Sequence, residues 1–244
     1  MPSRDILLPF LLVPLSPAFG RMERERSKAR LLALRKCELF AVGLILISFI
    51  LGIYVYPQLP GKLASHWNAQ GKADGYMSKF WGLFLLPIIS CGLFLLFLLI
   101  PRIDPLKANI DKFRGYYDGF MAIIMLFFFY LYLLTILWNL GRRFNMIAFL
   151  TPAFGILFYY CGILIKHAKR NWFIGIRTPW TLSSETVWEK THQIGEKLFK
   201  IAGVLALLGV LFQRYAFALV IIPIIIAALY TFIYSYFEYQ KEMK

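Results

Sequence analysis

The sequence has little charge, and almost none of it lies where the chain is most apolar. Only 16% of its 244 residues are Asp, Glu, Lys or Arg, whereas soluble domains contain about 25%. Hydrophobic residues make up 59% of the chain and are clustered in long uncharged blocks. This excess is too large for one soluble core, and it excludes disorder, which requires low hydrophobicity.

Cysteines and catalytic motifs are also scarce. Cys37, Cys91 and Cys161 lie in or beside apolar blocks, with no close pair among them. A disulfide framework or a zinc site needs clustered thiols, so we expect three free packing residues and no metal site. The sequence contains neither H-E-x-x-H nor G-x-S-x-G. We therefore expect neither an enzyme nor a bound cofactor.

Six apolar stretches are long enough, or nearly so, to cross a membrane, which takes roughly 20 helical residues. They are Leu39–Tyr56, Phe80–Ile100, Gly119–Leu140, Met146–Ile165, Leu198–Phe212 and Tyr215–Phe237. The fifth is short, so either its helix begins earlier, near Ile194, or it lies beside a locally thinned bilayer. Gln213 and Arg214 interrupt the last apolar run and predict a tight turn. The predicted fold class is all-α, a polytopic membrane protein with six transmembrane helices.

The distribution of basic residues predicts the orientation. With a cytoplasmic N-terminus, 21 of the 27 Lys and Arg residues fall in cytoplasmic segments. Because cytoplasmic loops carry an excess of Lys and Arg, both termini are predicted to be cytoplasmic. The net charge of +14 is then a topology signal, and we expect a multi-pass protein of the cell membrane with no direct nucleic-acid binding.

Three regions follow from this pattern. Residues 1–38 form a cytoplasmic N-terminal segment, proline-rich and then polybasic. Its first twenty residues contain four prolines, which disfavour a stable helix; Met22 as the start, or a loose segment on the membrane, are both open. Arg21–Lys36 is predicted to be a basic helix at the lipid surface, or a plain topology determinant. Residues 39–145 and 146–244 each hold three spans.

The first informative loop is 57–79, where Pro57 and Pro60 end the first span and favour an extended segment. An imidazole, an indole and an amide follow one another at His66-Trp67-Asn68. Asp74 and Lys79 are placed to pair across a turn. The loop is either a compact interfacial loop or a ligand-binding surface. The candidate peptide- or ligand-binding residues are His66, Trp67, Asn68, Gly71, Asp74, Tyr76 and Lys79.

The second informative segment is 170–192. Gly175 permits a positive φ, and Pro179 favours an extended Thr178. Ser183 is expected to cap a helix with Trp188 and His192 on one face. The arginines are also suited to bind lipid phosphate, which is the plain alternative. The candidate signalling residues are Arg170, Asn171, Gly175, Arg177, Thr178, Pro179, Trp180, Trp188 and His192.

These two segments carry a family resemblance. The run R-N-W-F-I-G-I-R-T-P-W-T-L-S-S-E-T-V-W-x₃-H, residues 170–192, resembles the hallmark of the SdpI family. The loop L-P-x-K-x-x-x-H-W-N-x-x-G-x-x-D-x-Y-x-S-K-F, residues 59–80, resembles the domain of unknown function that commonly precedes it. The resemblance implies a bacteriocin-immunity-type membrane protein that protects the cell from a secreted peptide toxin. It also implies a receptor role, in which toxin binding holds a cytoplasmic repressor at the membrane.

The spans themselves favour binding over chemistry. Five of the six spans contain no Asp, Glu, Lys, Arg or His. The remaining span, Leu198–Phe212, contains one such residue, Lys200. Pumps and ion-coupled transporters usually carry ionisable groups at membrane depth. We therefore expect loop 57–79 to bind a peptide outside and segment 170–192 to signal inside. Two alternatives stay open: a small transporter or enzyme that uses both loops as one site, and a structural membrane protein without a ligand.

Overall fold

The computed structural model describes the backbone of residues 17–244 and the side chains from residue 36 onward. Expectations for residues 1–16 therefore lie outside the described part of the chain. The elements in chain order are α1 (Pro17–Val55), η1 (Tyr56–Gln58), β1 (Lys62–Trp67), β2 (Ala73–Ser78), α2 (Lys79–Ile103), α3 (Lys107–Lys112), α4 (Arg114–Asn139), α5 (Met146–His167), α6 (Pro179–Ser183), α7 (Glu185–Leu208), η2 (Gln213–Tyr215) and α8 (Ala216–Glu242).

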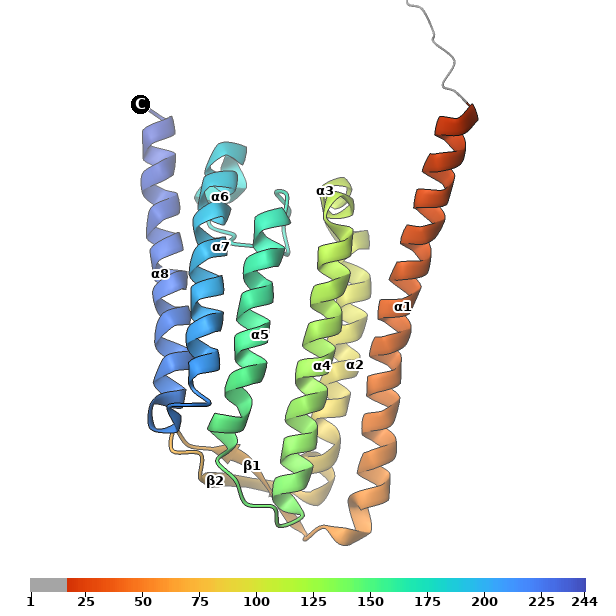
Figure 1. The fold of residues 1–244 in the computed structure, drawn as a ribbon, viewed down its shortest axis with the longest axis vertical. Helices are drawn as coiled ribbons and strands as arrows, with labels where there is room; N and C mark the ends of the chain where they lie inside the picture. The colour runs from red at the N-terminus through yellow and green to blue at the C-terminus, as the bar shows by residue number, and fades with distance from the viewer. Residues whose placement is uncertain (1–16) are drawn as a thin grey trace, which may run out of the picture.

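The long helices stand side by side in one layered bundle (Figure 1). Helices α1, α2 and α4 pack together as one group, and α5, α7 and α8 as the other. The β1–β2 hairpin closes one end, which we call the hairpin end. The short helices α3 and α6 lie at the opposite end, together with the C-terminus and the start of α1, and we call this the α6 end (Figure 1).

The helical prediction is confirmed. Within the described residues, five helices are long and apolar enough to cross a membrane: Lys36–Gln58, Lys79–Ile103, Arg114–Asn139, Met146–His167 and Gln213–Glu242. Helix α7 is not among them, because its first two thirds carry charged residues, from Glu185 to Lys200. The fold is thus an all-α polytopic membrane protein, while the sixth span and the cytoplasmic termini stay predictions. Residues 21–36 are helical, as predicted, and continue into the first span as part of α1.

Loop 57–79 is more ordered than the sequence predicts, because it folds into an antiparallel β-hairpin. Asn139, the last residue of α4, fixes this hairpin to the bundle. Its Oδ1 accepts from the Ala64 N–H at 2.8 Å, and its Nδ2 donates to the Ala64 carbonyl at 3.1 Å. One side-chain amide therefore replaces the neighbouring strand that β1 lacks on this edge. This tertiary bond spans 75 positions of sequence, so no local pattern predicts it.

Helices α5 and α7 make the closest contact in the bundle. A Cβ on Gly203 would lie 2.7 Å from the Gly155 carbonyl oxygen and 2.7 Å from the Tyr159 nitrogen. A Cβ on Gly155 would in turn lie 2.9 Å from the Gly203 carbonyl oxygen. Small residues allow helix backbones to approach closely within a membrane, where van der Waals packing drives association. The two glycines therefore hold the second group of helices together.

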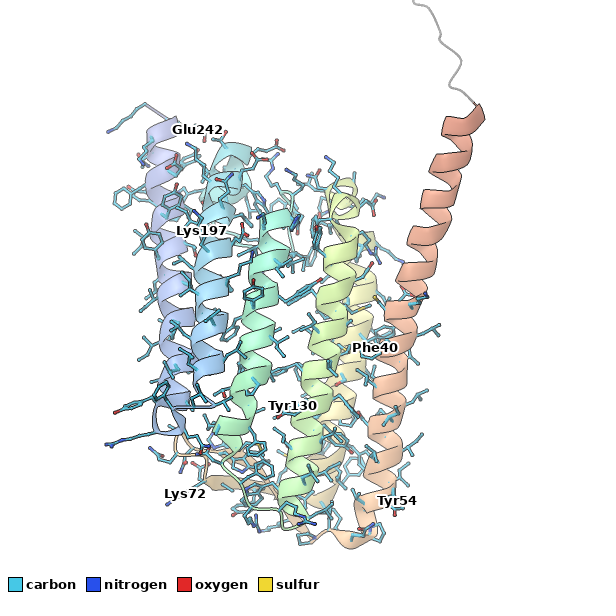
Figure 2. The ribbon with its side chains drawn as sticks, viewed as in Figure 1. Phe40, Tyr54, Lys72, Tyr130, Lys197 and Glu242 are labelled. Atoms are coloured by element: carbon cyan, nitrogen blue, oxygen red, sulfur yellow. The ribbon has the colours of Figure 1, made fainter. Side chains whose placement is uncertain are left out.

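The two groups meet mainly along α4 and α5. An apolar cavity of about 340 Å³ interrupts this seam, and its lining residues are Ile123, Leu126, Phe127, Tyr130, Pro152, Ala153 and Ile156. Figure 2 shows Tyr130 in the region between the two helices. Pro152 lacks an N–H, so α5 cannot form the helical hydrogen bond at that point. The cavity is open on one side, and beside it the Tyr130 hydroxyl donates to the Phe149 carbonyl across the seam at 2.9 Å.

Substitution of Gly203 tests the α5–α7 contact. We expect Gly203→Ala to lower the free energy of unfolding by about 1–3 kcal/mol, because the new methyl group overpacks two backbones. Thermal unfolding in detergent micelles measures the effect. Gly92→Ala is the matched control, since a Cβ at Gly92 in α2 meets nothing within 4 Å. Equal melting temperatures for the Gly203 variant and the wild type would contradict the close contact.

Cysteine labelling tests the orientation. After replacement of the three native thiols, Ala69→Cys at the exposed hairpin turn should react with a membrane-impermeant maleimide added outside intact cells. Ser183→Cys at the exposed end of α6 should react only after the cells are opened. The separation of these residues to opposite ends of the bundle and the bias in basic residues give this expectation. Labelling of both positions from one side would refute it.

Candidate functional site

At the hairpin end, the predicted residues divide into exposed groups and groups that build the fold. His66, Asp74 and Tyr76 are exposed on the strands. The His66 Nδ1 and the Asp74 Oδ1 lie 2.5 Å apart across the hairpin. The predicted pairing of Asp74 with Lys79 is therefore wrong. Lys79 instead donates to the Tyr56 carbonyl at 3.2 Å and lies over the Tyr56 ring.

Trp67, Asn68 and Gly71 serve the hairpin itself. Trp67 packs edge-on against Trp138 of α4, with ring centroids 5.7 Å apart. The Asn68 Oδ1 accepts from the backbone N–H groups of Gln70 and Lys72, both at 3.0 Å, and so fixes the turn. Gly71 has a φ of +75°, a conformation that favours glycine. Alanine at Trp67 or Asn68 would therefore disturb the fold before it tests any ligand.

An open depression of about 390 Å³ lies beside this turn. Its walls come from the hairpin turn and from the α4–α5 connection, and its lining residues are Gln70, Gly71, Lys72, Ala73, Trp138, Arg143, Phe144 and Asn145. Only Gly71 belongs to the predicted set. Arg143 lies with its guanidinium carbon 3.6 Å from the centroid of Trp138. The sequence signal for this site is the Arg142-Arg143 pair, since the charge bias leaves few cations at this end.

At the α6 end, Asn171 organises the predicted signalling segment. It is fully buried. Its Oδ1 accepts from the N–H groups of Phe173 and Ile174, at 2.9 and 2.6 Å. Its Nδ2 donates to the carbonyls of Lys169 and Ile174, both at 2.8 Å. A buried amide with four partners replaces the regular backbone bonds that this loop cannot form.

The hydroxyl groups that follow fix the segment to α7 and α8. Thr178 is extended, as predicted, and caps α6 in a reciprocal pair with Thr181. Its hydroxyl also donates to the Ser235 hydroxyl of α8 at 3.0 Å. The predicted cap Ser183 is wrong by one residue: Ser184 caps α7, where its Oγ accepts from the Val187 N–H. Pro179 takes the first position of α6, where its missing N–H has no cost.

Trp188 and His192 share one face of α7, as predicted, and stack with ring centroids 4.0 Å apart. The Trp188 Nε1 donates to the Ala168 carbonyl at 2.8 Å, which ties α7 to the end of α5. Gly175 lies against this pair with a φ of +116°, and a Cβ there would lie 2.5 Å from the His192 Nε2. Glycine is therefore required at 175 both by conformation and by space.

The hydrogen bonds of His192 fix its protonation. Its Nδ1 lies 2.7 Å from the Trp188 carbonyl, so this nitrogen is the donor. Its Nε2 accepts from the Ile176 N–H at 3.1 Å and cannot also hold a proton. Burial lowers the pKa of His192 to about 4, against a small opposing effect of the Trp188 carbonyl. The imidazole is therefore a neutral structural link between α7 and the segment.

Two residues that sequence reasoning missed join the two helix groups at this end. Asp104, after α2, is buried and accepts from the Trp172 N–H at 2.9 Å. The Asn109 Nδ2 of α3 donates to the Arg170 carbonyl at 2.8 Å. These partners lie 68 and 61 positions away in the sequence. No local signal marks the two residues for that reason.

Few residues of the segment remain for a partner. Trp172, absent from the predicted set, is 53% exposed. Arg177 is exposed and donates to the Trp172 carbonyl at 2.8 Å. By contrast, Trp180 packs against Phe232 and Tyr236 of α8. Arg170 donates to the Leu182 carbonyl at 3.2 Å. Trp172 and Arg177 are thus the side chains of this segment best placed to contact another molecule.

The buried imidazole predicts a pH dependence. Because the folded pKa of about 4 lies below the value of about 6.5 for an unfolded histidine, the unfolded chain binds a proton first as the pH falls. Stability that is present above pH 6.5 should be lost progressively down to about pH 4, by roughly 3 kcal/mol. In His192→Gln, whose amide oxygen can still accept from Ile176, this loss should shrink. The free energy of unfolding is measured by chemical unfolding at each pH. If His192→Gln loses as much stability as the wild type between about pH 6.5 and about pH 4, His192 is not a neutral structural residue.

Comparison with known proteins agrees with these two motifs. Residues 167–235 match the SdpI/YfhL protein family, and residues 43–90 match the domain of unknown function DUF1648. The chain is also 26% identical over 207 residues to the immunity protein SdpI of Bacillus subtilis (strain 168). This similarity covers 84% of the chain and 97% of that protein. No solved structure matches the chain.

The match at residues 43–90 contains the hairpin, and the match at residues 167–235 contains segment 170–192. The similarity to an immunity protein extends over most of both chains. Together with the five apolar helices, these matches support a multi-pass cell-membrane protein that contains a region similar to the SdpI/YfhL family, residues 167–235, preceded by a DUF1648 region, residues 43–90.

Proposed function

We propose that this protein protects its membrane by binding a membrane-active peptide toxin at the hairpin end, outside the cell, and that it signals through the α6 end to a cytoplasmic repressor. The observation that carries this proposal is the separation of the two motifs to opposite ends of the bundle (Figure 1). Similarity to an immunity protein supports the protective role. The basic residues favour the orientation.

The hairpin end offers exposed polar and aromatic groups. His66, Asp74 and Tyr76 are exposed on a hairpin that Asn139 holds in place, and His66 and Asp74 pair with each other across its strands. Lys72 is exposed at the turn, and Figure 2 shows it at this end of the molecule. A backbone that is already ordered lowers the entropy cost of binding. This surface is therefore suited to recognise a peptide.

Transmission to the other end has to occur by helix movement. Within the described spans there is no chain of ionisable groups to relay charge. The two helix groups meet mainly along α4 and α5, whose middle is interrupted by the apolar cavity. Such a seam permits rocking of one group against the other. Asp104 and Asn109 would pass that movement to Trp172 and Arg170, because they bond across the two groups.

The separation of the motifs also bears on the rival function. A transporter or enzyme that uses both loops as one site requires the hairpin and the α6 segment to converge. They lie at opposite ends of helices as long as α4, with 26 residues. Each motif would therefore need a separate partner. A receptor has two such partners, a ligand on one side of the membrane and a signalling protein on the other.

Exposed substitutions at the hairpin end test peptide recognition. In sensitive cells that express the protein, His66→Ala combined with Tyr76→Ala should reduce survival at least tenfold under a membrane-active peptide against which the wild type protects. Both side chains are exposed, so the variant should reach the membrane at the normal level. Protein abundance in the membrane fraction is the control. Full protection by the double variant would contradict recognition by this surface.

Substitutions at the α6 end test signalling separately. Trp172→Ala with Arg177→Gln should leave survival unchanged and weaken co-purification of a cytoplasmic repressor with the membrane. Lys197→Gln is the matched control, because Lys197 is exposed on α7 and is not one of the candidate signalling residues. If the double variant loses protection while its abundance is normal, the division between the two ends is wrong.

A further inference from the structure

The depression at the hairpin end has an unbalanced charge. The connections at this end contain six cations, Lys62, Lys72, Lys79, Arg142, Arg143 and Arg214, but one acid, Asp74. Asp74 is already occupied by His66. Among the ion pairs of the described residues, none includes Lys72 or Arg143, the two cations that line the depression. The site therefore attracts an anionic group.

The setting of Arg143 specifies the shape of that group. Its guanidinium lies against the face of Trp138, at 3.6 Å from the ring centroid, and this contact restrains a flexible side chain. Arg143 is exposed, so the N–H groups at the edge of its guanidinium are accessible to a ligand. A restrained guanidinium edge fits the two oxygens of a carboxylate in a bidentate pair.

Aromatic surface lies next to these cations. Trp138 and Phe144 line the same depression as Lys72 and Arg143. A ligand that fills it must therefore present an apolar side chain directly beside its anionic group. The last residue of a peptide has this arrangement, since one carbon atom carries both its side chain and its free carboxylate. In a phospholipid, by contrast, the glycerol and ester groups separate the phosphate from the apolar chains.

We propose that this depression binds the free C-terminal carboxylate of a peptide that ends in an apolar or aromatic residue. Arg143 holds the carboxylate, Lys72 adds a second positive charge at the turn, and the rings of Trp138 and Phe144 receive the last side chain. The identification of the biological ligand as a toxin peptide rests on the proposed function, in which the hairpin end recognises such a peptide. Binding of a peptide carboxylate can be tested whether or not that function holds.

A matched pair of probes tests the proposal. The full-length protein in nanodiscs of phosphatidylcholine is titrated with acetyl-Leu-Leu-Phe as the free acid or as the C-terminal amide, and dissociation constants are measured by NMR. The acid should bind about tenfold more tightly or better, since only it can form charge-assisted hydrogen bonds. Arg143→Gln should abolish the difference. Arg142→Gln is the control, since Arg142 is an exposed neighbour that does not line the depression, and it should keep the difference.

Three results would overturn the proposal. The acid and the amide could bind equally, or Arg142→Gln could act as strongly as Arg143→Gln. In the third, neither probe binds, and Arg143→Gln instead reduces the phosphatidylglycerol that stays bound in mixed-lipid nanodiscs, which assigns the site to a lipid headgroup. If His66→Ala with Tyr76→Ala loses protection but still binds the acid more tightly than the amide, both ideas are supported separately. The loss of protection supports toxin recognition by the strands, and the probe binding supports the carboxylate site. Normal probe binding by a protein that protects against no peptide would refute the proposed function alone.

Discussion

The contact between α4 and α5 is the one on which the rest of the structure depends, because it is the principal helix contact between two separate groups of three. Each group is held together by its own close packing, as the Gly155–Gly203 approach shows for the second. Between the groups, packing is broken by the cavity beside Pro152 and Tyr130. At the α6 end, polar bonds from Asp104 to Trp172 and from Asn109 to Arg170 join the two groups.

This arrangement gives both motifs a double role. At the α6 end, Asn171 and His192 satisfy backbone groups of an irregular loop, and Asp104 ties that loop to the first helix group. At the hairpin end, Asn139 ties the hairpin to α4. Most polar side chains of the two motifs therefore form hydrogen bonds within the fold. What remains for other molecules is small and specific, namely the exposed strand residues, the cationic depression, and Trp172 with Arg177.

Whether the sequence predicts a feature depends on how far apart in the sequence the interacting residues lie. The spans were predictable because hydrophobic length is a local property, and the stacking of Trp188 on His192 follows from a four-residue spacing on a helix. The hairpin was missed because its strands are stabilised by Asn139, 75 positions from Ala64. The role of Asp104 was missed because its partner Trp172 lies 68 positions away. The pairing of Asp74 with His66 is local, and it was missed because it depends on the register of the hairpin. Side chains that act between distant segments leave no periodic signal.

The central claim is that a peptide bound at the hairpin end moves one helix group against the other. Pulsed electron–electron resonance tests it most directly, with spin labels at Tyr54 on α1 and Leu211 after α7, both highly exposed at the hairpin end. The account predicts that a peptide against which the protein protects shifts the distance distribution between the labels. A second pair within one group, Leu211 with the exposed Phe237 of α8, should stay unchanged. An identical Tyr54–Leu211 distribution with and without saturating peptide would contradict the account.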